Sequence, residues 1–158
     1  MTGDLKREPP FLLMLVCMLV PVIQFCTPES CYEDTVSQVK AGFYQTGTGA
    51  NIVADTVSLY GLEMALSPIH NKSKDLMGVN FPLDPSTASC SFIFIINGIT
   101  DTVTFHYSSF PHLISKECGY SMFHTLESYT STRHLIDTII LRNRNITIPN
   151  EENISIFF

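Results

Sequence analysis

Apolar and polar residues alternate along several short stretches of this chain, which is the pattern of β-strands that bury one face. The clearest stretch spans residues 101–107, where large apolar side chains occupy every second position. Residues 92–96 form a run of aromatic and β-branched side chains, which predicts a strand buried on both faces. Asn97 and Gly98 connect the two stretches and both tolerate positive φ. We therefore predict a β-hairpin at the centre of a sheet.

The same alternation predicts further strands before and after this hairpin. No stretch shows helical periodicity, and Gly, Pro and Asn residues separate the strands. We predict an all-β fold, an antiparallel β-sandwich of the immunoglobulin-like or transthyretin-like kind, with a barrel around a ligand cavity as the alternative. The expected strands are 36–44, 53–62, 122–129, 134–144 and 154–158, with an extended piece at 114–120 and a long connection at 63–80 that holds a short strand or turn near 76–81.

The N-terminus has the composition of an export signal. A polar start that contains Lys6 and Arg7 precedes the almost wholly apolar run of residues 11–25. This run is short for a helix that crosses a bilayer. Pro21 also lies within it. Residues 1–25 are therefore predicted to be a signal peptide.

The segment after the signal is predicted to be a tether. Residues 26–34 are polar and acidic, and residues 35–158 then contain all the predicted strands of a single β-sandwich domain. Cys26 lies where a lipoprotein signal places its acylated cysteine, so we expect a lipid anchor there. The alternatives are plain secretion with Cys26 in a disulfide, or an uncleaved anchor.

Composition favours a globular, acidic protein. Of the 158 residues, 45% are hydrophobic and 15% are charged. This is enough apolar material for one core. The formal net charge is −6 and no basic patch is present. Nucleic acid is therefore not a predicted partner.

The spacing of the cysteines does not favour a metal site, because no two of them form a C-x-x-C pair. In an oxidising compartment, disulfides or a lipid-modified cysteine account for such residues. The five cysteines are Cys17, Cys26, Cys31, Cys90 and Cys118.

No arrangement of residues predicts catalysis or a cofactor. His106 and His112 are the closest pair of histidines, but no carboxylate or cysteine joins them at a useful spacing. Cys90 and Cys118 are expected to be buried thiols or disulfides rather than nucleophiles. We therefore predict no enzyme, no catalytic residue, no bound metal and no cofactor. The remaining titratable candidates are His70, His124, His134, Asp101, Glu117 and Asp137, and none of them forms an acid–base pair in sequence.

Two further groups of residues have both a structural and a functional interpretation. Five aromatic residues could form a binding surface, but we expect most of them to pack in the core or at its rim. Three asparagines match the glycosylation sequon; in a eukaryotic secretory protein they would mark surface sites, but we interpret them as chance matches. The aromatic residues are Tyr44, Tyr60, Phe110, Tyr120 and Tyr129, and the sequon residues are Asn71, Asn145 and Asn153.

Several segments in order resemble a set of small Bacteroidetes-type cell-envelope lipoproteins of unknown function. The most specific is 114–120, and the others are Cys26 followed by Cys31, then 42–44, 56–62, 81–83, 101–107 and 153–157. The chain departs from the pattern at Phe25, where that family has a small residue, and Cys90 is an additional cysteine. The resemblance implies a β-rich envelope protein with lipid on Cys26 and a disulfide between Cys31 and Cys118, but no reaction.

These observations predict an exported lipoprotein, anchored by lipid in the periplasm or outer membrane. Its sandwich would be a non-catalytic binding or structural module with an envelope protein or a glycan as ligand. One alternative is an envelope enzyme whose site is assembled only in the fold. Another is a secreted ligand-binding glycoprotein.

Overall fold

The computed structural model describes residues 31, 35–62, 68–148 and 151–158. All the described strands belong to one compact unit, residues 32–158. Within the described residues, no helix has the length and apolar character needed to span a bilayer. The predicted signal peptide and Cys26 lie outside the described residues. The strands are β1 (Gln38–Tyr44), β2 (Ala54–Gly61), β3 (Pro68–Leu76), β4 (Gly78–Pro82), β5 (Ser89–Ile96), β6 (Ile99–Ser115), β7 (Gly119–Ser131), β8 (Thr138–Leu141), β9 (Asn145–Ile146) and β10 (Ile154–Phe157).

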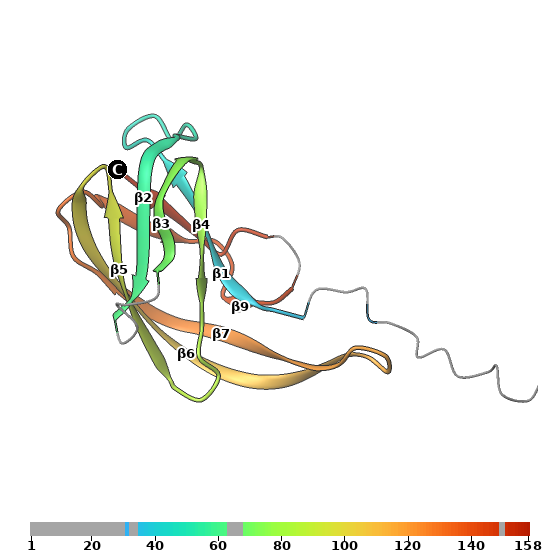
Figure 1. The fold of residues 1–158 in the computed structure, drawn as a ribbon. Coiled ribbons are helices and arrows are strands. Elements are labelled where there is room, and N and C mark those ends of the chain that lie inside the picture. Colours follow the sequence, from blue (N-terminus) through green and yellow to red (C-terminus); the bar gives the residue numbers. More distant parts are fainter. Residues whose placement is uncertain (1–30, 32–34, 63–67, 149–150) are drawn as a thin grey trace, which may run out of the picture. The chain divides into compact units, whose positions relative to one another are not determined.

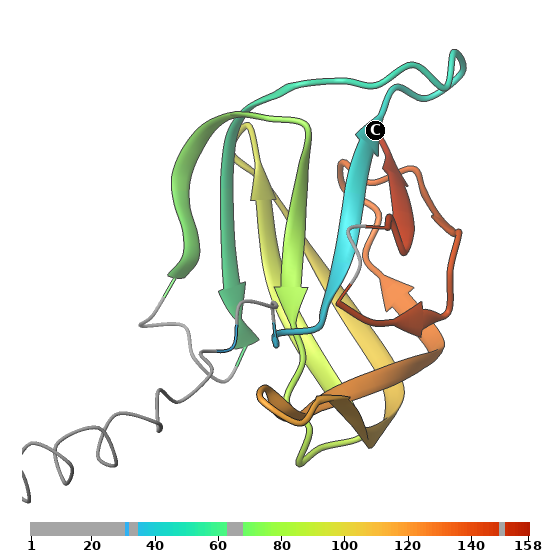
Figure 2. The ribbon, with the colours of Figure 1, turned by 90° about the vertical axis from the view of Figure 1, so that its right-hand side faces the viewer.

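The strands form two sheets that pack as a β-sandwich, which confirms the predicted fold class. One sheet has the order β4-β1-β10-β8 and the other the order β3-β2-β5-β6-β7-β9. Figure 2 shows the two layers, with the C-terminal strand β10 beside β1. These two strands pair in parallel, whereas the other described pairings are antiparallel.

The predicted hairpin is confirmed at the centre of the larger sheet. Strands β5 and β6 pair from Ser89 with His106 to Ile96 with Ile99. Asn97 and Gly98 form the turn with φ angles of 50° and 85°. An asparagine and a glycine adopt this left-handed backbone at little steric cost, so the turn sequence fixes the register of the pair.

The core lies between the two sheets and is rich in phenylalanine. The inward residues of β1, Val39, Ala41 and Phe43, are buried as the alternation predicts. Phe81 of β4 is fully buried at the centre of an aromatic cluster. Its ring centroid lies 5.2 Å from that of Phe92, 5.9 Å from that of Phe94 and 5.1 Å from that of Phe105. All three pairs have the edge-to-face geometry that aromatic rings prefer.

Two predicted boundaries were wrong. Strand β3 was interpreted as a connection, because its sequence is polar and lacks alternation; it is an exposed edge strand in which Lys72 and Asp75 have positive φ. The strand predicted at 134–144 is shortened to β8, since the backbone of residues 134–136 donates to Asp101 instead of to a neighbouring strand.

Strands β6 and β7 extend past the other strands as a long hairpin (Figure 1). The extended piece expected at 114–120 is the end of this hairpin, with a turn at 116–118. We call residues 108–125 the arm. Its apolar side chains Phe110, Leu113 and Tyr120 are 44%, 49% and 71% exposed. The regular alternation of β6 ends after Tyr107, and these three large apolar side chains lie at the surface of the hairpin.

Candidate functional site

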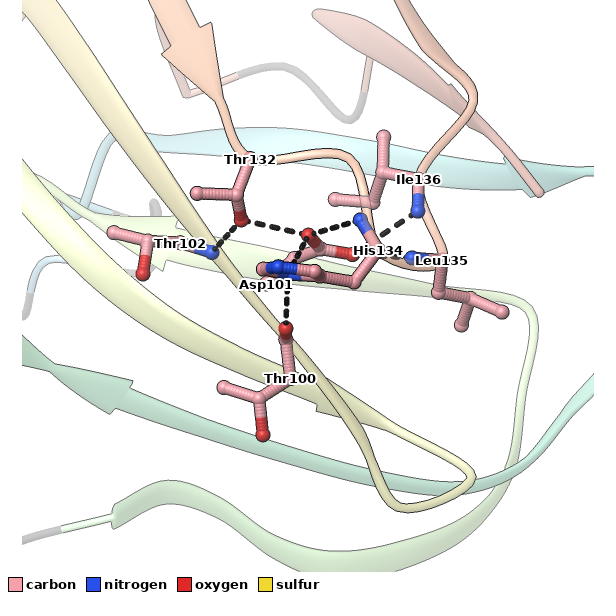
Figure 3. Close-up of polar contacts among 7 residues, drawn as sticks. All are labelled: Thr100, Asp101, Thr102, Thr132, His134, Leu135 and Ile136. Carbon is pink, nitrogen blue, oxygen red and sulfur yellow. Dashed lines mark hydrogen bonds and ion pairs between the residues drawn. The ribbon is translucent and has the colours of Figure 1, made fainter.

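A buried carboxylate holds the end of β7 to the start of β6. Asp101 is 2% exposed and lies on the core face of β6. Its Oδ1 accepts hydrogen bonds from Thr132 Oγ1 at 2.6 Å and from the backbone N–H of His134 at 2.8 Å. Its Oδ2 accepts from the N–H groups of Leu135 and Ile136 at 2.9 and 3.0 Å. Figure 3 shows these donors converging on the carboxylate from one loop.

The hydrogen bonds keep Asp101 ionised despite its burial. Burial raises the pKa of the carboxyl, but the donors from Thr132 and from the three backbone N–H groups outweigh it and lower the pKa to about 2. The charge therefore lies where the chain leaves β7 and turns toward the smaller sheet. Asp101 acts as a clasp between two segments that are about thirty residues apart in sequence.

The same carboxylate contacts an exposed histidine. His134 Nδ1 lies 2.9 Å from the carbonyl oxygen of Thr100 and 3.1 Å from Asp101 Oδ1, so Nδ1 carries a proton and donates to these acceptors. An Asp–His pair of this kind orients a general base in hydrolases. Here the pair holds the loop after β7, because its hydrogen bonds join His134 to Thr100 and Asp101.

A cavity of about 470 Å³ opens at another place, beside the start of β5. Its walls come from the end of β2, from β3, from the β4–β5 loop and from β5, and its apolar part is the larger one. The residues that line it are Gly61, Leu62, Ile69, Pro82, Leu83, Asp84, Pro85, Thr87, Ser89, Cys90, Ser91 and Phe92.

The hydroxyl of Tyr107 organises the loop that forms one wall of this cavity. It donates to the carbonyl of Asp84 at 2.8 Å and accepts from the N–H of Asp84 at 3.1 Å. Thr87 Oγ1 and Cys90 Sγ lie 3.0 and 2.9 Å from the same oxygen. Burial, followed by the hydrogen bond with Cys90, raises the pKa of Tyr107 to about 12, so the hydroxyl stays protonated at neutral pH.

Replacing Tyr107 by phenylalanine should loosen this wall and expose the thiol of Cys90. The variant leaves the two Asp84 groups and Thr87 without their shared partner, which should lower the free energy of unfolding by about 1–3 kcal/mol. We expect Cys90 to react with iodoacetamide several-fold faster, measured by quantifying the modified peptide by mass spectrometry.

The matched control is Tyr129→Phe on β7. Tyr129 also donates its hydroxyl to a backbone carbonyl, that of Ile139 at 2.6 Å, but it does not contact the β4–β5 loop. This variant should lose stability and leave the labelling rate of Cys90 unchanged. Equal labelling rates for wild type and Tyr107→Phe would contradict the role given to the hydroxyl.

The histidines do not meet in one place. His106 and His112 are exposed and lie six residues apart on β6. Six residues of extended strand span about 20 Å. His112 stacks on Phe123 at 4.4 Å between ring centroids. Within the described part of the chain, no group of three His, Cys, Asp or Glu side chains is placed to hold a metal ion.

The burial of His124 was not predicted from the sequence. This residue is 2% exposed, its Nδ1 lies 2.8 Å from Ser109 Oγ, and its ring meets that of Tyr107 edge-on at 5.4 Å. Burial lowers the pKa of His124, so the ring is neutral at pH 7. The alternation in β7 places position 124 on the core face, which was the available signal.

The cysteines fall into three groups. Cys31 and Cys118 are each disulfide-bonded, and Cys118 lies in the turn of the arm. Cys90 is a free, half-buried thiol. Cys17 and Cys26 lie outside the described residues. A disulfide in this protein is therefore established, and the partner of each bonded cysteine is treated below as part of the proposal.

The aromatic residues do not form one surface. Tyr44 stacks on Phe157 on the smaller sheet, whereas Phe110 and Tyr120 are exposed on the arm. Tyr44, Tyr60 and Tyr129 are half-buried, so three of the five lie at the rim, as expected for most of them. Asn153, one of the sequon residues, is 3% exposed. Its side chain bonds the backbone of Lys40, Asn143 and Asn145, so the folded protein does not present it for glycosylation.

Comparison with known proteins gives one match. A family model described as a family of unknown function (DUF6452) matches residues 56–158. No curated protein and no solved structure matches the chain.

Proposed function

We propose that this chain, which belongs to the family of unknown function DUF6452, is an exported, lipid-anchored envelope protein. Its β-sandwich would act as a non-catalytic binding or structural module. The observation that carries the proposal is the disulfide bonding of Cys31 and Cys118 in a chain whose N-terminus has the pattern of an export signal. Structural disulfides persist in oxidising compartments and are rare in the cytosol.

The anchor is assigned to Cys26. It follows the apolar run of residues 11–25 directly, at the position of the acylated cysteine in lipoproteins. A lipid there would leave the tether of residues 26–34 between the membrane and the sandwich. This location would be the periplasm or the outer membrane, and the resemblance to Bacteroidetes-type lipoproteins supports it.

The disulfide is assigned to the pair Cys31 and Cys118. These are the disulfide-bonded cysteines of the described residues, and the likeness to envelope lipoproteins pairs them. Such a bond would tie the tether to the turn of the arm. Closing so long a loop would stabilise the fold by roughly 3–5 kcal/mol in the entropic description.

The binding role is supported by the cavity beside β5 and the non-catalytic role by the positions of the titratable groups. Asp101 lies at the start of β6 and His134 in the loop after β7, and the hydrogen bonds of the pair hold that loop. His124 is buried against Ser109. Neither group lines the cavity, whose titratable lining residues are Asp84, hydrogen-bonded to Ser86, and Cys90, beside the hydroxyl of Tyr107.

Intact mass spectrometry of the protein purified from its native envelope tests the proposal. We expect a mature chain that begins at Cys26 and carries added acyl mass. Reduction should add about 2 Da, the two hydrogens taken up by one disulfide, and peptide mapping should join Cys31 to Cys118. A chain that begins elsewhere without lipid would refute the anchor, and a map in which either cysteine bonds another residue would refute the pairing.

A further inference from the structure

We propose that the cavity beside the start of β5 binds a small, uncharged, mainly apolar molecule that carries a hydroxyl or carbonyl group. The cavity has a volume of about 470 Å³. Cavities that hold small-molecule ligands have volumes from roughly 300 Å³ upward, so this one is large enough. The inference rests on the proposed binding role of the sandwich and not on the lipid anchor.

The apolar character of the ligand follows from the walls. Leu62 and Ile69 stand on one side, 51% and 37% exposed, and Leu83 and Phe92 reach the cavity from the core. Exposed aliphatic side chains at the mouth of a cavity gain free energy when a ligand removes them from water, at about 25 cal/mol per Å² of apolar area.

The absence of net charge in the ligand follows from the electrostatics of the lining. No lysine, arginine or histidine lies among the described residues that line the cavity. A phosphate or carboxylate would therefore lose its hydration without gaining a counter-ion. The carboxylate of Asp84 accepts hydrogen bonds from the N–H of Ser86 at 2.8 Å and from its hydroxyl at 2.6 Å, and because Asp84 is exposed, water solvates its charge without a ligand cation.

The polar group of the ligand follows from the hydroxyls on one wall. Thr87, Ser89 and Ser91 line the cavity on the side of the β4–β5 loop and the start of β5. Ser91 Oγ is engaged with Thr104 Oγ1 at 2.8 Å, and Thr87 with Tyr107. Ser89 is an exposed residue of the lining, and we infer that its hydroxyl meets a hydroxyl or carbonyl group of the ligand.

The loop that carries these hydroxyls is pinned by Tyr107, which makes the cavity a formed site before any ligand arrives. The paired hydrogen bonds to Asp84, at 2.8 and 3.1 Å, fix the start of the loop. A pre-formed wall reduces the ordering that binding must impose, which favours affinity.

The test uses the mature protein and a neutral fluorescent probe, Nile red, with competitors added to the complex. We expect saturable binding of one probe per chain, displacement by 1-naphthalenemethanol, and at least tenfold weaker displacement by 1-naphthoate, which has the same ring system and a negative charge. Occupancy should also slow the modification of Cys90 by iodoacetamide, measured on the Cys90 peptide.

Two isoleucine-to-serine variants distinguish binding in this cavity from non-specific adsorption of the probe. Ile69→Ser removes an apolar wall and should weaken probe binding at least fivefold. Ile140→Ser changes an isoleucine of similar exposure, 40% against 37%, on the smaller sheet and should leave binding unchanged. Ser89→Phe should fill the mouth and also weaken binding.

Equal binding by the two isoleucine variants, an absence of saturable binding, or equal displacement by the alcohol and the acid would each overturn the inference. The outcome is independent of the anchor. A mature chain that binds the probe but has no acyl mass would refute the anchor and keep the cavity, and a lipidated chain without probe binding would do the reverse.

Discussion

Replacing Asp101 by asparagine is expected to lower the free energy of unfolding by about 3 kcal/mol or more. The carboxylate accepts from Thr132 and from the N–H groups of residues 134–136, and asparagine keeps one acceptor oxygen and points an amide donor at the remaining N–H groups. Each buried donor that loses its acceptor costs about 1–3 kcal/mol. Urea unfolding followed by far-UV circular dichroism measures the effect, because the chain has no tryptophan.

The matched control for this variant is Asp55→Asn. Asp55 is an exposed residue of β2. The same change of charge there should alter stability by no more than about 0.5 kcal/mol. If the two variants lose the same amount, the clasp is not a major source of stability.

The pH dependence of stability provides a second test of the contribution of Asp101. The pKa of Asp101 is about 2 in the folded protein, below the ordinary value of 3.8. Its contribution to stability is therefore present above the ordinary pKa and is lost as the pH falls through the folded-state pKa. Wild type should lose roughly 2 kcal/mol more than Asp101→Asn between about pH 4 and about pH 2. Parallel pH profiles would show that folding does not lower the pKa of Asp101 below its ordinary value.

Replacing Phe81 by alanine is expected to cost about 3–5 kcal/mol of unfolding free energy. The ring is fully buried and meets three other phenylalanine rings, so its removal leaves a cavity between the sheets that rigid aromatic neighbours fill poorly. The loss includes both the transfer of the ring to water and the contacts of the atoms around the cavity. Thermal and urea unfolding of the purified variant give the value.

Phe110→Ala makes the same substitution in a different environment. Phe110 is 44% exposed on the arm, and its ring lies 6.3 Å from that of Phe123. Its removal should cost about 1–2 kcal/mol, less than that of Phe81, because nearly half of the side chain stays in water after folding and water can enter the space left behind. A loss similar to that of Phe81→Ala would mean that the arm is part of the cooperative core.

The candidate site was less predictable from the sequence than the fold. Pro82 and Pro85 indicated a turn, and Asp84 and Thr87 do form one, with the N–H of Thr87 donating to the carbonyl of Asp84 at 3.2 Å. The alternation in β6 indicated that Tyr107 faces inward. The pattern carries no information on which distant residues meet. The register of the paired strands, not the local sequence, brings Thr87 and Cys90 to the hydroxyl of Tyr107.

Asp101 also shows the difference between what the sequence pattern predicts and what the tertiary structure adds. Its place in the alternation put a carboxylate on the core face, which by itself is an unfavourable burial. The donors that make this burial acceptable come from residues 132–136, and the β-branched sequence from residue 134 onward predicted the start of a strand there. A short-range pattern records side-chain preference, and it does not record which distant carboxylate competes for the backbone N–H groups.

The sequence by itself determined the all-β class, the central hairpin and the inward faces of β1 and β6, because these depend on alternation and on the turn residues Asn97 and Gly98. Strand β5, which the sequence predicts to be buried on both faces, buries Phe92, Phe94 and Ile96 and leaves the residues between them half-buried. Only the tertiary structure decided the parallel pairing of β1 with β10, the polar edge strand β3, the clasp at Asp101 and the cavity beside β5. Each of these joins segments far apart in the chain, where contacts are set by the packing of two whole sheets rather than by neighbouring residues.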